Sequence, residues 1–359
     1  MAVSYKGKII YQRGVGYSNL DALVAMKPDQ PFRLYECFRP VTSAAIMQLV
    51  EKKKIETSTP VFEYLEIELP DGADRNLKNI TVDHLLHDTA GFDKKALFDP
   101  IRDPDKLAKL INERDSPVTS EKVINFMIEQ SLAHEPGKSR SDSNFGYFLL
   151  GKVIEKASGT TYEKYIQEQL IRPLKLDSFS VAKSYVDERP RNEVTYYHRT
   201  NWYKPINYGE RDFGKYVPIA DAINIELFGA AGGWIGTPTD VLKFASAVRA
   251  KRSPILSTDS IKETFAVPAH ALAKAKGKTV RNYYAAGWFA TQDRDGRTHV
   301  IGGTTGSVMI VHYYGDGLGF AISTNRLANA DNSHAANVLM NPKNGLVDTI
   351  KATTKRIRK

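Results

Sequence analysis

The chain has 359 residues, of which 42% are hydrophobic and 25% are charged, and its formal net charge is +9. This composition is typical of a globular protein with a large core, arranged as one big domain or two closely packed ones. No apolar run is long enough to cross a bilayer, and a single cysteine excludes an internal disulfide and a cysteine-rich metal site. The basic residues are mostly dispersed and no nucleic-acid or phosphate-loop motif accompanies them, so we expect no nucleic-acid partner.

The N-terminal residues 2–17 alternate and turn like a β-hairpin. A helix is expected to start near Glu36, and another after Thr81, whose side chain suits a helix N-cap. Helical patterns recur through the middle of the chain, at residues 121–131, 146–157, 162–170 and, after a Gly-rich turn, within 227–250. Strand patterns return from Asn282 onward, and a last helix is expected from about Leu346. Strands at both ends with helices between them predict a sheet lobe formed by the two termini and an inserted helical lobe.

Four segments of the chain carry recognisable motifs. They read F-R-L-Y-E-C-F-R-P-V-T-S-A-A-I-M-Q-L-V-E-K-K-K-I at 32–55, I-T-V-D-H-L-L-H-D-T-A-G-F at 80–92, P-G-K-S-R-S-D-S-N-F-G-Y-F-L-L-G at 136–151 and V-I-G-G-T-T-G at 300–306. They resemble, in turn, four motifs of the class C β-lactamase and penicillin-binding-protein-like family. These are its nucleophile helix, its T-[IV]-x-H-L-L-x-H-T-[SA]-G segment, its Y-S-N loop and its H-x-G or K-T-G strand.

The resemblance implies an α/β (α+β) fold of the serine β-lactamase type. An antiparallel sheet is flanked by helices, and an all-helical region is inserted. We assign residues 1–60 and 250–359 to the sheet lobe and residues 61–249 to the helical lobe. The resemblance also implies a loop at residues 195–217 that borders the cleft between them. Aromatic side chains are frequent in that loop.

The four positions that carry the chemistry of this family differ in this chain. The family uses a serine, a lysine three residues later, a tyrosine and a histidine or lysine on the far strand. At those positions the resemblance puts Glu36, Arg39, Asp142 and Val300. The scaffold is therefore expected to be kept while acyl-serine chemistry is not.

Other nucleophiles are poorly placed to replace the family's serine. Ser43 lies nearly two helical turns beyond Glu36. Ser141 and Ser143 have no lysine three residues later, and Cys37 is expected to be a small buried hydrophobe on another helix face.

Glu36 and Asp142 are expected to face one cleft as a pair of carboxylates. The helix N-terminus favours the Glu36 anion by roughly 0.3–1 kcal/mol, and Arg39 is expected to favour it further. Asp142 beside that anion would then bind a proton more readily, which gives a base or nucleophile next to an acid. Glycoside hydrolysis is the best-known use of such a pair, while dehydration, isomerisation, lyase chemistry or a shared divalent cation would fit it equally well.

The sequence therefore predicts a hydrolase for a small polar substrate such as a glycoside, without a cofactor or metal ion, in which Glu36, Arg39 and Asp142 are catalytic. The predicted substrate-binding residues are Asn144, Gly302, Gly303 and Thr304 from the motifs, and Tyr197, Trp202 and Tyr203 from the aromatic loop. The aromatic residues would stack on a sugar or another ring, although packing of the loop itself explains many of them.

Two other hypotheses remain open. A non-catalytic ligand-binding homologue is the main alternative, because a Glu–Arg pair three residues apart is a common helix-surface ion pair. A serine esterase, peptidase or β-lactamase is the third. His84 and His87 are interpreted as structural residues and not as a metal site. A soluble protein is expected, cytoplasmic or exported with its leader removed, and the oligomeric state stays open.

Overall fold

The computed structural model describes residues 1–93, 99–101, 104–112, 118–183, 188–197, 225–292, 296–304, 307–325 and residue 352. Two of the predicted binding residues, Trp202 and Tyr203, lie outside the described residues, as does most of the loop at 195–217. The helix expected from about Leu346 also begins outside them.

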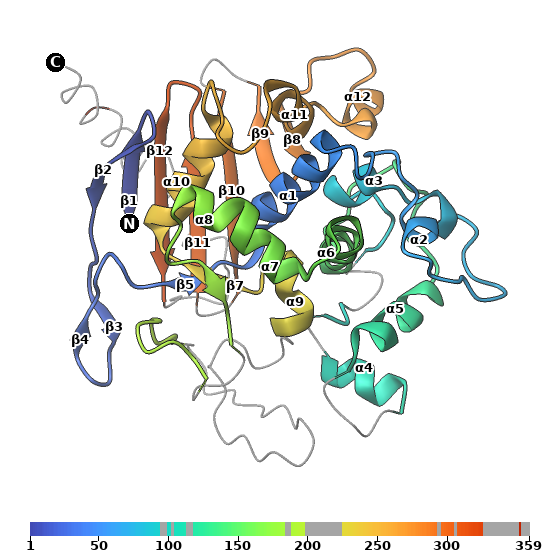
Figure 1. The fold of residues 1–359 in the computed structure, drawn as a ribbon, viewed down its shortest axis with the longest axis horizontal. Coiled ribbons are helices and arrows are strands. Elements are labelled where there is room, and N and C mark those ends of the chain that lie inside the picture. The colour runs from blue at the N-terminus through green and yellow to red at the C-terminus, as the bar shows by residue number, and fades with distance from the viewer. Residues whose placement is uncertain are drawn as a thin grey trace.

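A seven-stranded antiparallel sheet joins the two ends of the described chain, in the strand order β2-β1-β12-β11-β10-β9-β8 (Figure 1). Its central strands are rich in β-branched residues, and β11 is buried along its whole length. The first strand pairs with the last, with Ala2 opposite Ala321. The strands are β1 (Ala2–Tyr5), β2 (Lys8–Gln12), β8 (Asn282–Ala285), β9 (Trp288–Thr291), β10 (Thr298–Thr304), β11 (Ser307–Tyr313) and β12 (Leu318–Thr324).

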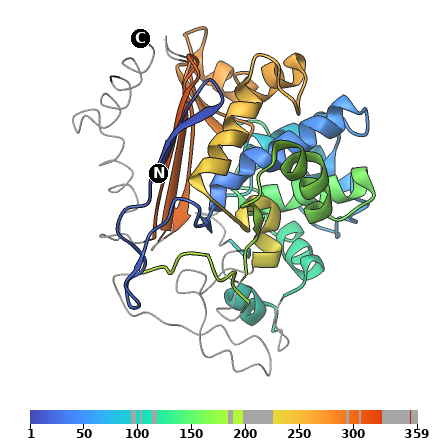
Figure 2. The ribbon, with the colours of Figure 1, turned by 60° about the vertical axis from the view of Figure 1, so that its left-hand side comes forward.

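The helices lie together on one side of this sheet, as Figure 2 shows with the sheet nearly edge-on. They are α1 (Arg39–Glu51), α2 (Val61–Tyr64), α3 (Val82–Leu86), α4 (Pro104–Leu110), α5 (Ser120–Ile128), α6 (Asn144–Ser158), α7 (Tyr162–Ile166), α8 (Arg172–Leu174), α9 (Ile225–Gly232), α10 (Pro238–Arg249), α11 (Thr258–Thr264) and α12 (Ala269–Ala275). Single turns occur at η1 (Tyr35–Phe38), η2 (Leu77–Asn79) and η3 (Gln167–Ile171). The predicted fold class, an antiparallel sheet flanked by helices, is confirmed.

The remaining described strands form two small sheets. One pairs β3 (Tyr17–Asn19) with β4 (Val24–Ala25), and the other has the order β5-β7-β6, with β5 (Phe32–Arg33), β6 (Ser180–Val181) and β7 (Trp234–Gly236). Helix α10 packs against β1, β11 and β12, although its residues lie inside the segment assigned to the helical lobe. The proposed division into two lobes stays a prediction.

Helix α1 is the central element of the helical side, because its residues are buried from Arg39 to Leu49. The Thr42 hydroxyl donates a hydrogen bond to the carbonyl of Ala230 in α9, at 2.7 Å. Just before the helix, the Phe38 ring stacks on Trp234 with centroids 4.6 Å apart. These contacts fix the start of α1 and the turn η1 just before it, where the predicted nucleophile position lies.

Side-chain caps fix the starts of α3 and α6. Thr81 is the N-cap of α3, as the sequence predicts, and it also forms a capping box with His84. Ser143 caps α6, since its hydroxyl accepts a hydrogen bond from the Gly146 N–H at 3.1 Å. This cap fixes the residues immediately before α6, which include Asp142.

Candidate active site

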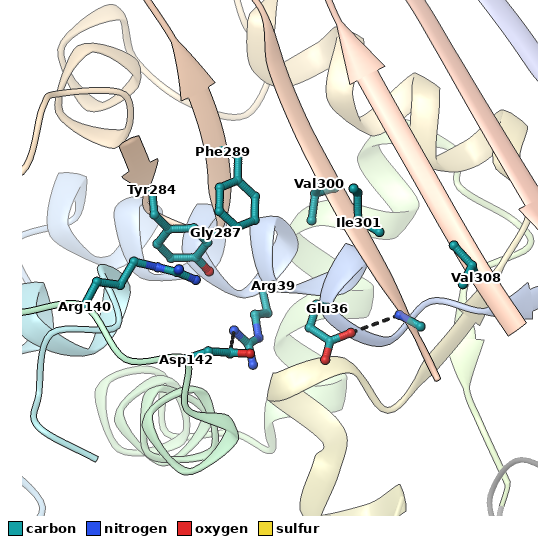
Figure 3. A pocket seen from close by; sticks show the side chains of 11 residues that line it. Glu36, Arg39, Arg140, Asp142, Tyr284, Gly287, Phe289, Val300, Ile301 and Val308 are labelled. Atoms are coloured by element: carbon teal, nitrogen blue, oxygen red, sulfur yellow. Dashed lines mark hydrogen bonds and ion pairs between the residues drawn. The ribbon is translucent and has the colours of Figure 1, made fainter. Parts of the chain in front are cut away.

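A cavity of about 270 Å³ lies between η1 and the start of α1, the loop before α6 and strands β8 to β11 (Figure 3). Glu36 and Asp142 both point toward it, and Arg39 lies beside Asp142. The structure thus brings together the three residues that the motifs predict to be catalytic. The complete lining is Glu36, Arg39, Arg140, Asp142, Tyr284, Gly287, Phe289, Val300, Ile301, Gly303 and Val308.

Glu36 lies in the turn η1 and is held by the neighbouring strand. The preceding residue, Tyr35, has a φ of 47°, in the left-handed region. One carboxylate oxygen of Glu36, Oε2, accepts a hydrogen bond from the backbone N–H of Gly303 in β10, at 3.1 Å. The side chain is half-buried, so the rest of the carboxylate faces the cavity.

The predicted binding residues of β10 have different positions. Gly303 lines the cavity and donates to Glu36. Gly302 packs against the backbone of η1 instead, where a Cβ atom would lie 2.4 Å from the carbonyl oxygen of Leu34. Thr304 pairs with Ser307 at the end of the strand, and its side chain lies outside the described atoms.

Arg39 is almost completely buried and contacts two acidic residues. Its Nη1 atom lies 2.7 Å from Asp142 Oδ1 and 3.4 Å from Asp88 Oδ2. Its Nη2 atom donates to Asn144 Oδ1 at 2.8 Å, and its guanidinium carbon lies 4.7 Å from the centroid of the Tyr147 ring. Burial lowers the pKa of Arg39, but the charges of Asp142 and Asp88 outweigh it and hold that pKa well above its usual value.

These contacts differ from one expectation from the sequence and bear on a second. Arg39 was predicted to hold Glu36 ionised, yet its ion pairs are with Asp142 and Asp88. Asp142 was predicted to be the proton donor, but an arginine at ion-pair distance favours the carboxylate form. The physical reason is local. Glu36 sits in the separate turn η1 before α1 and not on the α-helix itself.

Asp88 completes the network and was not predicted from the sequence. Its side chain is fully buried, and its Oδ2 atom accepts from Arg140 Nη2 at 3.2 Å as well as from Arg39. Burial raises its pKa to about 6, and the charge of Asp142 adds to that rise while Arg39 and Arg140 oppose it. One signal was present in the sequence. When the T-[IV]-x-H-L-L-x-H-T-[SA]-G motif is laid over residues 80–92, its second histidine falls on Asp88.

Asn144 and Tyr197 are not among the residues that line the cavity. The Asn144 side chain is buried, with its oxygen bonded to Arg39 and its nitrogen donating to Asp99. It therefore holds the arginine in place. The Tyr197 hydroxyl accepts a hydrogen bond from the backbone N–H of Leu20 at 2.7 Å, which ties it to the turn between β3 and β4.

Two aromatic residues and one further arginine at the cavity were also missed. The guanidinium carbon of Arg140 lies 4.1 Å from the centroid of the Tyr284 ring and 5.1 Å from that of Phe289. The hydroxyl groups of Tyr284 and Tyr147 are 3.1 Å apart. The alternating pattern of residues 282–291 predicts strands, but only the order of strands in the sheet brings Tyr284 and Phe289 beside the loop before α6.

None of the other serine and cysteine residues named from the sequence lines this cavity. Ser43 is fully buried in α1, and the buried Cys37 thiol donates to the carbonyl of Met309 at 3.3 Å. Val300 lines the cavity, whereas His299 stacks between Phe289 and His312 and does not. Within the described part of the chain, no group of three or more histidine, cysteine, aspartate or glutamate residues is arranged to hold a metal ion.

The fold and cleft define the class of serine β-lactamase-like proteins, and the sequence matches the Beta-lactamase family over residues 1–341. The chain therefore belongs to the β-lactamase family. The putative penicillin-binding protein PbpX of Bacillus subtilis (strain 168) is 27% identical over 183 residues, which cover 51% of this chain and 41% of that protein. The chain spans about half the length of the curated relatives it matches.

Solved structures show the same fold at low identity. The octameric penicillin-binding protein homologue from Pyrococcus abyssi has a TM-score of 0.68 and 22% identity, over 94% of this chain and 72% of that one. EstCE1, described as a hydrolase with promiscuous acyltransferase activity, has a TM-score of 0.71 and 21% identity, over 93% and 90% of the two chains. None of the helices in the described residues is both long and apolar enough to span a membrane.

Proposed function

We propose that this protein is a hydrolase that uses the carboxylate pair of Glu36 and Asp142 in place of a serine nucleophile. The observation that carries the proposal is that both carboxylates line one cavity of about 270 Å³. A small polar molecule fits that volume, and glycosides are the first substrate class to test because two carboxylates catalyse their hydrolysis in most enzymes that perform it.

The contacts support a division of roles between the two carboxylates. Asp142 is paired with Arg39 at 2.7 Å and is therefore kept as an anion. It would act as the nucleophile, or would stabilise positive charge that develops on the substrate. Glu36 has no ion pair with a described residue and only a backbone N–H as a hydrogen-bond partner there. We assign it the transfer of protons to and from substrate and water.

Hydrolysis as the reaction class is supported by membership of the β-lactamase family. The structural neighbour EstCE1 is itself described as a hydrolase. An acyl-serine route is not supported, because Glu36 and Arg39 occupy the positions at which the motif has its serine and lysine, and Ser43 is fully buried.

The test is a panel of chromogenic glycosides and esters, measured on the wild type, Glu36→Gln and Asp142→Asn. We expect each substitution to lower turnover by about 10² or more, as loss of a general acid or base does. Glu63→Gln, at an exposed position on α2, is the matched control and should leave turnover unchanged. If Glu36→Gln keeps the wild-type rate on a substrate that the wild type hydrolyses, the proposal is wrong.

A non-catalytic ligand-binding role is the second candidate, and the closed network around Arg39 favours it. Asp88, Asp142 and Asn144 all contact this one buried guanidinium, an arrangement that would also serve as a structural support. Two results together would favour this candidate over catalysis. The wild type would hydrolyse no substrate of the panel, and it would bind a sugar in the cavity that Glu36→Gln no longer binds.

A further inference from the structure

A second cavity, of about 520 Å³, adjoins the first and is formed by the loop before α6, helix α12 and strands β8 to β10. The two cavities share Arg140, Tyr284 and Phe289, which lie together in Figure 3. A single ligand can therefore contact both spaces across these three side chains. The lining of the second cavity is Lys138, Ser139, Arg140, His270, Ala271, Lys274, Asn282, Tyr283, Tyr284, Phe289, Ala290 and His299.

The second cavity is lined by cationic side chains and by no acidic one. Lys138 and Lys274 are exposed and form no ion pair with any described residue. Arg140 is paired with Asp88, but its Nε atom is buried without a hydrogen-bond partner among the described residues. Three positive charges thus surround the second cavity. Two of them, on Lys138 and Lys274, are not neutralised by any described residue.

The two histidines of this cavity add no positive charge near pH 7. The pKa of His270 is lowered by its burial and by the charges of His87, Arg140 and Lys274, against an opposing effect from Asp83. Burial and the charge of Arg297 lower the pKa of His299 to about 4. Both imidazoles are therefore neutral near pH 7, and the positive charge there comes from the two lysines and Arg140.

We propose that the second cavity binds an anionic group, a carboxylate or a phosphate, on the substrate whose reactive bond lies between Glu36 and Asp142. This inference rests on the proposed function for its orientation, because the first cavity would hold the reacting part. Lysine and arginine side chains are the usual partners of carboxylates and phosphates. Tyr283, Tyr284 and Phe289 would pack against the uncharged part of the same molecule.

The positions of the two cavities indicate how a bound anionic group would contribute to catalysis. Arg140 lines both, and its guanidinium is already fixed by Asp88 and by the rings of Tyr284 and Phe289. An anionic group bound beside it would hold the rest of the substrate in the first cavity. Binding energy from a part of the substrate that does not react would then orient the part that does.

The experiment is calorimetric titration of the protein with inorganic phosphate, with glucuronate and, as the neutral counterpart, with glucose. The double substitution Lys138→Gln with Lys274→Gln removes the two unpaired charges, and Lys278→Gln, an exposed lysine outside the lining, is the matched control. We expect the double variant to bind the anion at least tenfold more weakly, which corresponds to about 1.4 kcal/mol, while the control binds within about twofold of wild type.

The anion that binds with the higher affinity identifies the anionic group of the substrate. Tighter binding of glucuronate indicates a carboxylate, and tighter binding of phosphate indicates a phosphate ester. Failure of the wild type to bind either anion would overturn the inference, as would equal affinity for glucose and glucuronate with no phosphate binding. An anion affinity unchanged in the double variant would overturn it too. Inorganic phosphate contacts only the second cavity, which Glu36 does not line, so Glu36→Gln should bind phosphate as the wild type does. Anion binding without any turnover that depends on Glu36 would therefore reject the catalytic proposal and leave the anion site standing.

Discussion

The buried carboxyl group of Asp88 makes a quantitative prediction about stability. Its pKa is raised from the ordinary value of 3.8 to about 6, chiefly because its side chain is fully buried. Each unit of pKa shift corresponds to about 1.36 kcal/mol, so ionisation of Asp88 lowers the free energy of unfolding by about 3 kcal/mol. The raised pKa means that this stability is fully present below about pH 3.8 and is lost as the pH rises through 6.

The substitution Asp88→Asn isolates this effect, because an asparagine has nearly the shape of the protonated carboxyl and does not titrate. We expect the free energy of unfolding of the wild type to fall relative to that of the variant by about 3 kcal/mol between pH 3 and pH 7.5. Urea denaturation followed by tryptophan fluorescence measures both proteins at each pH. Groups that titrate alike in the two proteins cancel in the difference, and Asp71→Asn, at an exposed position, provides the control.

The two arginines that contact Asp88 oppose the effect of burial on its pKa. Arg39 at 3.4 Å and Arg140 at 3.2 Å both favour the carboxylate. Arg39, however, shares its charge with Asp142 at the shorter distance of 2.7 Å, and the Asp142 charge itself repels that of Asp88. If the difference between wild type and Asp88→Asn does not change with pH, or moves in favour of the wild type as the pH rises, the arginines outweigh burial and this reasoning is refuted.

Three further predictions concern the same region. Arg39→Met should lower the free energy of unfolding by about 3–5 kcal/mol, because Asp88 and Asp142 both lose the buried arginine that contacts them, and Arg39→Lys should cost less. Denaturation of both variants checks this, and wild-type stability of Arg39→Met would contradict it. A fluorescent penicillin should give no covalent adduct by intact-mass measurement, whereas a stoichiometric adduct on any serine would restore the acyl-serine hypothesis. Gly302→Ala should destabilise the protein by about 1–3 kcal/mol in thermal denaturation, because its Cβ atom would lie 2.4 Å from the carbonyl oxygen of Leu34; an unchanged melting temperature would show that β10 and η1 can separate.

Local motifs predicted the fold and much of the cavity because the relevant residues are close together in the sequence. The segment at 32–55 located Glu36 and Arg39, the segment at 136–151 located Asp142, and the motif around Gly303 located the strand beside them. Each of these three segments contributes residues to the same cavity. The fold and the family could therefore be predicted before any contact was known.

The partners of Arg39 could not be predicted from the sequence, because they depend on long-range packing. Spacing alone paired it with Glu36, three residues away. In the structure its partners are Asp88, 49 positions away, and Asp142, 103 positions away. The left-handed φ at Tyr35 and the separate turn η1 direct Glu36 toward β10. Conformation at one residue therefore separates Glu36 from the arginine with which helix spacing had paired it.

The second cavity was missed for a related reason. Its cationic residues come from two parts of the chain that are far apart in sequence, and the sequence shows Lys138 and Lys274 only as members of a dispersed basic population. They lie together because α12 packs beside the loop before α6. A charge pattern in sequence cannot reveal such a grouping, since it depends on tertiary packing alone.

The central claim, that Glu36 and Asp142 act together on a substrate, is tested most directly by the pH dependence of kcat/KM on the best glycoside in the panel. For the wild type we predict a bell-shaped profile whose two limbs belong to the coupled pair. Glu36→Gln should lower the maximum by about 10² or more and remove one limb. A profile for Glu36→Gln with the height and both limbs of the wild type would contradict the account.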